Sequence, residues 1–129
     1  MVRLTSDDVA CWVLNTAGDV EVGELTRCVR PSYRLGLMAP GQPCLLWRSG
    51  RHDPGVHALG VLTGEPRDGV VPVRFTRLAE PVPRAELVAD RVFGEAEVIR
   101  MPAGSNPSWL SAAQYAVVLA RAGSPQLGP

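Results

Sequence analysis

Turn-forming sequences that contain proline or glycine recur along the whole chain and divide it into short apolar segments. They lie at residues 17–19, 40–41, 52–55, 66–69 and 123–125. Proline lacks the backbone N–H that helices and sheets use, and glycine adopts turn conformations that other residues avoid. The apolar runs between these turns are short, which is typical of strands. We therefore expect a small domain built mainly from short strands.

Five segments predict strands: residues 9–14, 27–30, 43–48, 56–62 and 71–77. Segments 43–48 and 56–62 flank a Pro-Gly turn, which predicts a hairpin. The second is apolar on both faces, so we expect it to be a central strand. In 71–77 the apolar residues alternate with polar ones, which indicates one buried face. Pro72 within this segment predicts an edge strand, because it cannot donate to a ladder.

Short helices are predicted at residues 32–38, at 84–90 and after Ser111. Ser32 is a suitable N-cap for the first, and Ser111 with Gln114 forms a capping box for the last. In the last helix, one face carries Tyr115, Val118, Leu119 and Ala122. The expected fold class is α+β, mainly β. From apolar faces of separate elements we expect a core that includes Val13, Leu46, Ala58, Val73 and Leu119.

A chain of 129 residues fits one domain, which we place at residues 1–129 with its core at about 10–120 and short tails, including 126–129. The 13 basic and 13 acidic residues give no net charge, and every basic residue is arginine. Mechanisms that need a lysine amine, such as Schiff-base chemistry, are therefore excluded. Residues 25–52 hold five arginines and no acid. This segment is either a local anion-binding surface or a set of solvated side chains.

Cys11, Cys28 and Cys44 have neither disulfide nor zinc-knuckle spacing, and Cys11 and Cys44 lie in apolar runs typical of buried cysteine. The histidines at 52 and 57 also lack metal-ligand spacing, so we expect no metal site. Free cysteines favour a reducing compartment. The N-terminus lacks the apolar segment of a secretion signal, and no apolar run is long enough to cross a membrane. A cytoplasmic location is the expectation.

Four stretches carry a resemblance that spans about residues 10–120. The first strand ends as Trp-Val-Leu-Asn at 12–15, and the hairpin runs from Pro40-Gly41 through Leu-Trp-Arg-Ser-Gly at 46–50 to 54–61. A strand leads into a helix at 78–87, and Ser-Asn-Pro at 105–107 precedes the last helix. In this order the stretches resemble the EVE domain family of the PUA-like superfamily, related to YTH and ASCH domains. The resemblance implies a pseudobarrel, or β-barrel, of about five to six strands with short helices and a pocket at one end.

The resemblance also implies a function: a non-catalytic domain, without a cofactor, that reads modified bases in DNA or RNA. The sequence leaves the oligomeric state open, with a monomer slightly favoured. Carried over position by position, the base pocket would comprise Asn15, Cys28, Val29, Trp47, Ser49 and Gly50. Phosphates would contact Arg30, Arg34, Arg48 and Arg51. Cys28 stands where relatives usually carry tryptophan, which implies a wider pocket.

Strand geometry supports part of this site, because Trp47 and Ser49 share one face of their strand. An indole plane can stack on a base, and the Asn15 amide can both donate and accept. We expect Asn15, Trp47 and Ser49 to converge on one cavity, with Cys28 on its wall. Other interpretations stay open: Trp47 as a core residue, and Asn15 and Ser49-Gly50 as turn residues. At the level of function, the alternatives are an ASCH-type hydrolase of modified nucleosides and a protein–protein adaptor.

Overall fold

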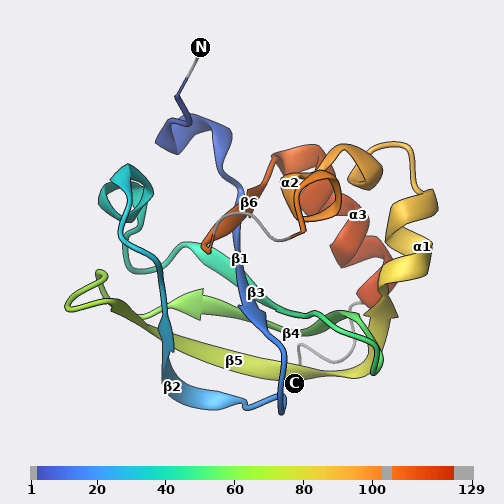
Figure 1. Cartoon of the computed structure of the whole chain (residues 1–129), viewed down its shortest axis with the longest axis horizontal. Helices are drawn as coiled ribbons and strands as arrows, with labels where there is room; N and C mark the ends of the chain where they lie inside the picture. The colour runs from blue at the N-terminus through green and yellow to red at the C-terminus, as the bar shows by residue number, and fades with distance from the viewer. Residues whose placement is uncertain (1–2, 103–105, 124–129) are drawn as a thin grey trace.

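The computed structural model describes residues 3–102 and 106–123, so Ser105 and the predicted tail at 126–129 lie outside the described residues. One six-stranded sheet has the order β2-β5-β4-β3-β1-β6 (Figure 1). Of the neighbouring strand pairs in the described part of this sheet, the β1–β3 pair is parallel and the others are antiparallel. The strands are Cys11–Thr16 (β1), Gly23–Cys28 (β2), Pro43–Arg48 (β3), Gly55–Leu62 (β4), Val70–Pro83 (β5) and Ser108–Leu110 (β6).

The sheet is open, with β2 and β6 at its two edges, so the expectation of a closed β-barrel is wrong. β1 pairs in parallel with β3, and Figure 1 shows that the sheet is strongly curled, so that β1 lies at a steep angle to β4 and β5. The mixed α+β class and the number of strands are confirmed.

Three short α-helices accompany the sheet in the described ranges: Arg84–Ala89 (α1), Glu97–Arg100 (α2) and Ala112–Ala122 (α3). Short 3₁₀ helices span Ser6–Asp8 (η1), Tyr33–Leu37 (η2) and Phe93–Glu95 (η3). In Figure 1 the α-helices lie together on one side of the sheet. Within these ranges, no helix has the length and apolar character that a membrane span requires.

Two apolar clusters lie on opposite faces of the sheet, as the alternation of side chains along β3 shows. Leu45 and Trp47 belong to the cluster that α1, η3 and α3 cover, whereas Cys44 and Leu46 belong to the cluster inside the curl. Side chains of a strand point alternately to the two faces, so β3 supplies both clusters.

The hairpin was the most accurately predicted part of the fold. The β3 strand has the expected bounds, and β4 begins one residue earlier than expected and lies in the interior of the sheet. The buried alternation of Val71, Val73 and Phe75 is also confirmed.

The edge position predicted from Pro72 is wrong, because β5 lies between β2 and β4. The carbonyl of Pro72 accepts a hydrogen bond from the Thr63 N–H. In an antiparallel strand the nitrogen and the carbonyl of one residue face the same neighbour, so the ring nitrogen of Pro72 also faces Thr63. Thr63 follows the last residue of β4, and the missing N–H therefore falls just beyond that ladder.

The last helix begins as predicted, since the Ser111 hydroxyl accepts from the Gln114 N–H at 3.2 Å and the Gln114 side chain accepts from the Ser111 N–H at 2.9 Å. Tyr115, Val118 and Ala122 pack on the helix-covered cluster. Leu119 is 38% exposed, so its assignment to the core is wrong. The other four predicted core residues, Val13, Leu46, Ala58 and Val73, are buried.

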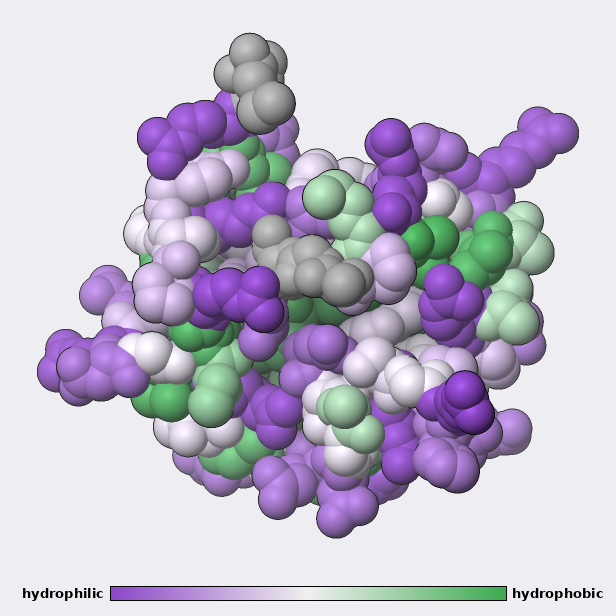
Figure 2. Space-filling view, viewed as in Figure 1, coloured by the Kyte–Doolittle hydropathy of each residue, from purple (hydrophilic) through white to green (hydrophobic). Residues whose placement is uncertain are grey.

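Hydrophilic side chains dominate the face of the molecule seen in Figure 2. Apolar residues gather at the right of this view, in the region of α1. Val88 in α1 and Val92 after it are each 42% exposed. Scattered exposed apolar side chains of this kind are common on soluble domains.

Candidate functional site

One side-chain hydrogen bond links the ends of β1 and β2, and two further hydrogen bonds link the end of β2 to Asn106, which precedes β6. The Arg27 guanidinium donates to the Asn15 carbonyl at 2.8 Å, and the Asn106 amide donates to the Cys28 carbonyl at 2.9 Å. The Arg30 N–H donates to the Asn106 carbonyl at 2.7 Å. We call these five residues the polar seam. It joins two parts of the chain that no strand ladder connects in the described residues.

The polar seam contains Asn15 and Cys28, two of the residues predicted for one site, but each is bonded to a different partner, Asn15 to Arg27 and Cys28 to Asn106. Both are exposed, and the Asn15 side-chain amide has no hydrogen-bond partner within the described ranges. The Nε atom of Arg27 and the Oδ1 atom of Asn106 are buried without a partner in the described part of the chain. The seam therefore retains both donor and acceptor capacity.

Trp47 does not share a cavity with these residues, and the prediction that it would is wrong. Its side chain is 4% exposed, and its ring stacks on Phe93 with centroids 6.1 Å apart. Although Trp47 is the β3 partner of Asn15 in the sheet, it lies where η3 covers the sheet. The core interpretation of this tryptophan is the one that the structure supports.

Ser49, Gly50 and Val29 have structural roles in this arrangement. The Ser49 N–H and hydroxyl both donate to the Thr16 carbonyl, at 2.9 and 3.4 Å, which ties the end of β3 to that of β1. Gly50 has a φ of 99°, a left-handed conformation that favours glycine in the turn that follows. Val29 is buried inside the curl of the sheet. None of the three lies in the polar seam as defined above.

Arg34 is not an available phosphate ligand, because it is paired within the protein. Its guanidinium donates to both carboxylate oxygens of Glu97, at 2.8 and 2.7 Å, and to the Pro107 carbonyl at 3.0 Å. The Ser108 hydroxyl also donates to Glu97, at 2.7 Å. Burial raises the pKa of the Glu97 carboxyl, but the hydrogen bonds from Arg34 and Ser108 outweigh it and lower the pKa. This pair links η2 to α2 and β6.

The other three predicted phosphate ligands make no side-chain hydrogen bond or ion pair to the described residues. Arg30 and Arg51 are exposed, whereas Arg48 is half-buried at the end of β3. The Nε atom of Arg48 is buried and unpartnered there. These three arginines are available to an anionic partner.

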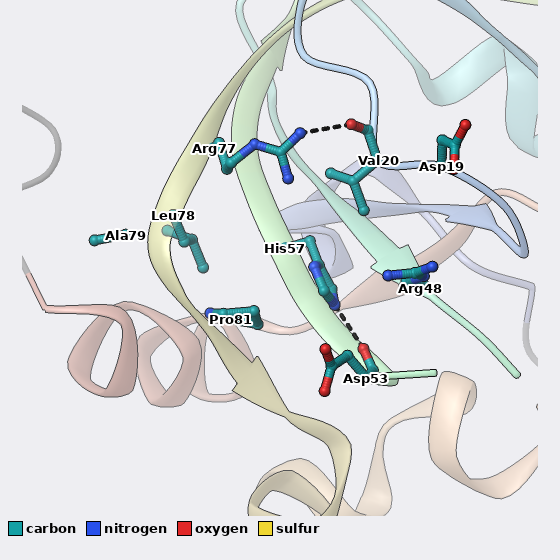
Figure 3. A pocket seen from close by; sticks show the side chains of 9 residues that line it. All are labelled: Asp19, Val20, Arg48, Asp53, His57, Arg77, Leu78, Ala79 and Pro81. Atoms are coloured by element: carbon teal, nitrogen blue, oxygen red, sulfur yellow. Dashed lines mark hydrogen bonds between the residues drawn. The ribbon is translucent and has the colours of Figure 1, made fainter. Parts of the chain in front are cut away.

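A cavity of about 370 Å³ lies at the end of the curled sheet, where the connection between β1 and β2 passes the ends of β3 and β4 (Figure 3). Of the residues predicted for the site, it contains only Arg48. Its lining comprises Asp19, Val20, Arg48, Asp53, His57, Arg77, Leu78, Ala79 and Pro81. The lining contains no phenylalanine, tyrosine or tryptophan on which a base could stack. The cavity is therefore not the base pocket that the resemblance implied, because it contains none of the six residues predicted for that pocket.

His57 and Arg77 of this cavity were not predicted as site residues. Arg77 was assigned to the end of a strand, and His57 was noted only for its lack of metal-ligand spacing. A register shift in β4 between Val56 and Ala58 displaces His57 from the regular alternation, and no sequence pattern indicates that shift. In the described ranges, no group of three or more potential metal ligands is present.

The two cysteines predicted to be buried are confirmed as core residues. Burial raises the pKa of the Cys44 thiol to about 12 and raises that of Cys11 well above its ordinary value. Thiols held in the neutral form are poor nucleophiles.

No protein-family model matches the chain, and no curated protein matches it in sequence. Solved structures match it in fold. A hypothetical protein from Leishmania major has a TM-score of 0.77 at 17% identity, over 91% of this chain and 96% of that one.

Human THYN1 protein, solved in complex with DNA containing 5-methylcytosine, has a TM-score of 0.71 at 14% identity, over 88% of this chain and 98% of that one. The DUF55 domain of human thymocyte nuclear protein 1 has a TM-score of 0.68 at 15% identity, over 86% of this chain and 97% of that one. At sequence identities this low, structural similarity shows a shared fold and nothing more. The chain therefore has the PUA-like fold of the DUF55, or EVE, domain, as the sequence resemblance implied.

Proposed function

We propose that this chain is a non-catalytic nucleic-acid-binding domain that reads a modified base at the polar seam. The observation that carries the proposal is the hydrogen bond from the Arg27 guanidinium to the Asn15 carbonyl, which fixes the end of β1 beside β2 while the Asn15 side-chain amide stays exposed and unpartnered in the described ranges. An unpaired amide that both donates and accepts suits the edge of a base held out of its stack. Human THYN1, which has the same fold, is known in complex with DNA containing 5-methylcytosine, and this supports the proposal.

The unpartnered arginines supply the electrostatic part of the proposed interface. Arg30 belongs to the polar seam, and Arg48 and Arg51 flank the turn after β3. Phosphate contacts position a nucleic acid without reading its sequence. In this proposal, therefore, the three arginines contribute affinity, and Asn15 contributes the preference for the modified base.

Fluorescence anisotropy with a labelled oligonucleotide tests this division of roles. Arg30→Ala and Arg51→Ala should weaken binding of modified and unmodified strands alike, and each should reduce the salt dependence by about one counterion. Asn15→Ala should instead reduce the preference for the modified strand. Arg91→Ala is the matched control, since Arg91 is exposed, has no side-chain partner in the described ranges and lies in the segment after α1.

The control variant should bind as the unaltered protein does. Affinities unchanged in both Arg30→Ala and Arg51→Ala would contradict phosphate contact at this face. A wild-type affinity that stays constant from about 50 mM to about 200 mM salt would contradict it equally, because phosphate contacts release counterions.

A further inference from the structure

The cavity at the end of the sheet encloses a histidine that is almost fully buried. His57 is 5% exposed, and its Nε2 atom lies 2.6 Å from the Asp53 carbonyl oxygen (Figure 3). A carbonyl can only accept, so Nε2 carries the proton of the neutral ring. Within the described residues, Nδ1 has no hydrogen-bond partner. The ring can therefore take a second proton at Nδ1 without losing its existing bond.

Four other charged side chains line the same cavity, each from a different part of the fold. Arg48 comes from β3, Arg77 from β5, Asp19 from the connection after β1 and Asp53 from the turn before β4. The remaining lining residues are uncharged. The two arginines and two aspartates cancel, so the charge of His57 decides whether the lining is neutral or positive. Imidazole is the side chain that ordinarily changes charge between about pH 5 and pH 8.

The arginines of the cavity have donors to offer an anion. The Arg48 side chain makes no hydrogen bond or ion pair to the described residues, and its Nε atom is buried. One terminal N–H group of Arg77 donates a hydrogen bond to the Val20 carbonyl at 2.7 Å, and the other N–H groups of the guanidinium stay available. The planar fork of a guanidinium matches the oxygens of phosphate-like anions. Leaving a buried donor unpaired is unfavourable, so an acceptor at Arg48 would be stabilising.

We propose that this cavity is a proton-controlled anion site, which binds a phosphate-class group between Arg48 and Arg77 when His57 is protonated. The site shares Arg48 with the proposed nucleic-acid interface but contains none of the five residues of the polar seam, and it needs no nucleic acid to be tested. Because linkage is reciprocal, bound anion favours protonation of His57 to the same extent that the proton favours the anion. The affinity should fall as the pH rises and His57 becomes neutral.

Sulfate is the appropriate probe, because it keeps its two charges across this pH range and so reports the titration of the protein. Calorimetric titration at constant ionic strength should give an affinity about tenfold higher at about pH 5.5 than at about pH 8, a coupling of ordinary size. Absence of sulfate binding at the lower pH would overturn the proposal.

The chain contains its own matched control, since it has two histidines and His52 is exposed in the turn before β4. His57→Gln should remove the pH dependence of sulfate binding, and His52→Gln should leave it intact. Arg48→Ala should weaken binding at both pH values. An unchanged pH dependence in His57→Gln would overturn the proposal.

A second measurement keeps the proposal testable if His57→Gln does not fold. In the unaltered protein, NMR titration of the His57 ring protons should show a midpoint that moves to higher pH when sulfate is added. A midpoint that does not move contradicts the coupling.

Competition against sulfate distinguishes the two sources of phosphate. Displacement by a nucleoside monophosphate, and not by an oligonucleotide without terminal phosphates, identifies a free or terminal phosphate as the ligand. Displacement by the oligonucleotide identifies a backbone phosphate and places the cavity on the nucleic-acid path. If neither competes, the phosphate class is wrong, whereas the proposed reader function at the seam is unaffected.

Discussion

Leu46 lies inside the curl of the sheet, and none of its side chain is exposed. Leu46→Ala should lower the free energy of unfolding by about 2–5 kcal/mol, because it removes apolar contacts and leaves a cavity. Leu119→Ala is the matched control: that leucine is 38% exposed, so its replacement should change the stability by about 0.5 kcal/mol or less. Urea denaturation measures both. Equal losses in the two variants would contradict the assignment of the core.

The Arg34–Glu97 pair predicts a pH dependence of stability. The pKa of Glu97 is lowered in the folded protein, so its contribution is present above the unfolded pKa of about 4.3 and is lost as the pH falls through the folded value. Glu97→Gln should cost about 1–3 kcal/mol at neutral pH, because it removes charge-assisted hydrogen bonds.

The difference in stability between the unaltered protein and Glu97→Gln should narrow from about pH 6 to about pH 3. Urea denaturation across this range measures it. Glu95→Gln should have little effect at any pH, since Glu95 is 75% exposed and lies 4.0 Å from Arg100. A difference that stays constant with pH would show that the Glu97 charge is not what stabilises the pair.

At the residue scale, the sequence could predict that Trp47 and Ser49 share a face, but not which face the helices cover. That depends on η3 and Phe93, which are more than forty residues later in the chain. Asn15 and Cys28 were expected in one site from the resemblance; both belong to the polar seam, where each is bonded to a different residue. Arg34 was predicted as free because its partner, Glu97, is likewise distant in the sequence.

At the scale of elements, the cap of α3 is the feature most directly tied to the sequence. Ser111→Ala removes the acceptor for the Gln114 N–H and should lower stability by about 0.5–2 kcal/mol. Ala113→Ser, at an exposed position of the same helix, should have a much smaller effect because it changes no cap. Thermal unfolding followed by circular dichroism compares the two. Equal shifts in Tm would show that the cap does not stabilise α3.

Elements with a strong local signal were predicted closely, and those without one were missed. The hairpin of β3 and β4 has apolar runs on both sides of a turn, and α3 has a capping box. In contrast, β6 is three residues long and is a strand only because it pairs with β1. The register shift between β4 and β5 likewise depends on the pairing of the two strands.

At the scale of the whole molecule, the curl of the sheet places two sites on different parts of it. The polar seam spans the open side between β1 and β2, and the charged cavity lies where β3 and β4 meet the connection after β1. Local patterns do not predict either site in full, because both are made by contacts between distant segments. The resemblance predicted the fold that creates them.

The central claim is that this domain reads a modified base, and two duplexes that differ by one methyl group test it most directly. Anisotropy titrations should compare a duplex that contains one 5-methylcytosine with the same duplex containing cytosine. Burial of a methyl group contributes about 0.8 kcal/mol, so we predict about fourfold tighter binding of the methylated duplex. Equal affinity for the two duplexes, or no binding of either, would contradict the claim.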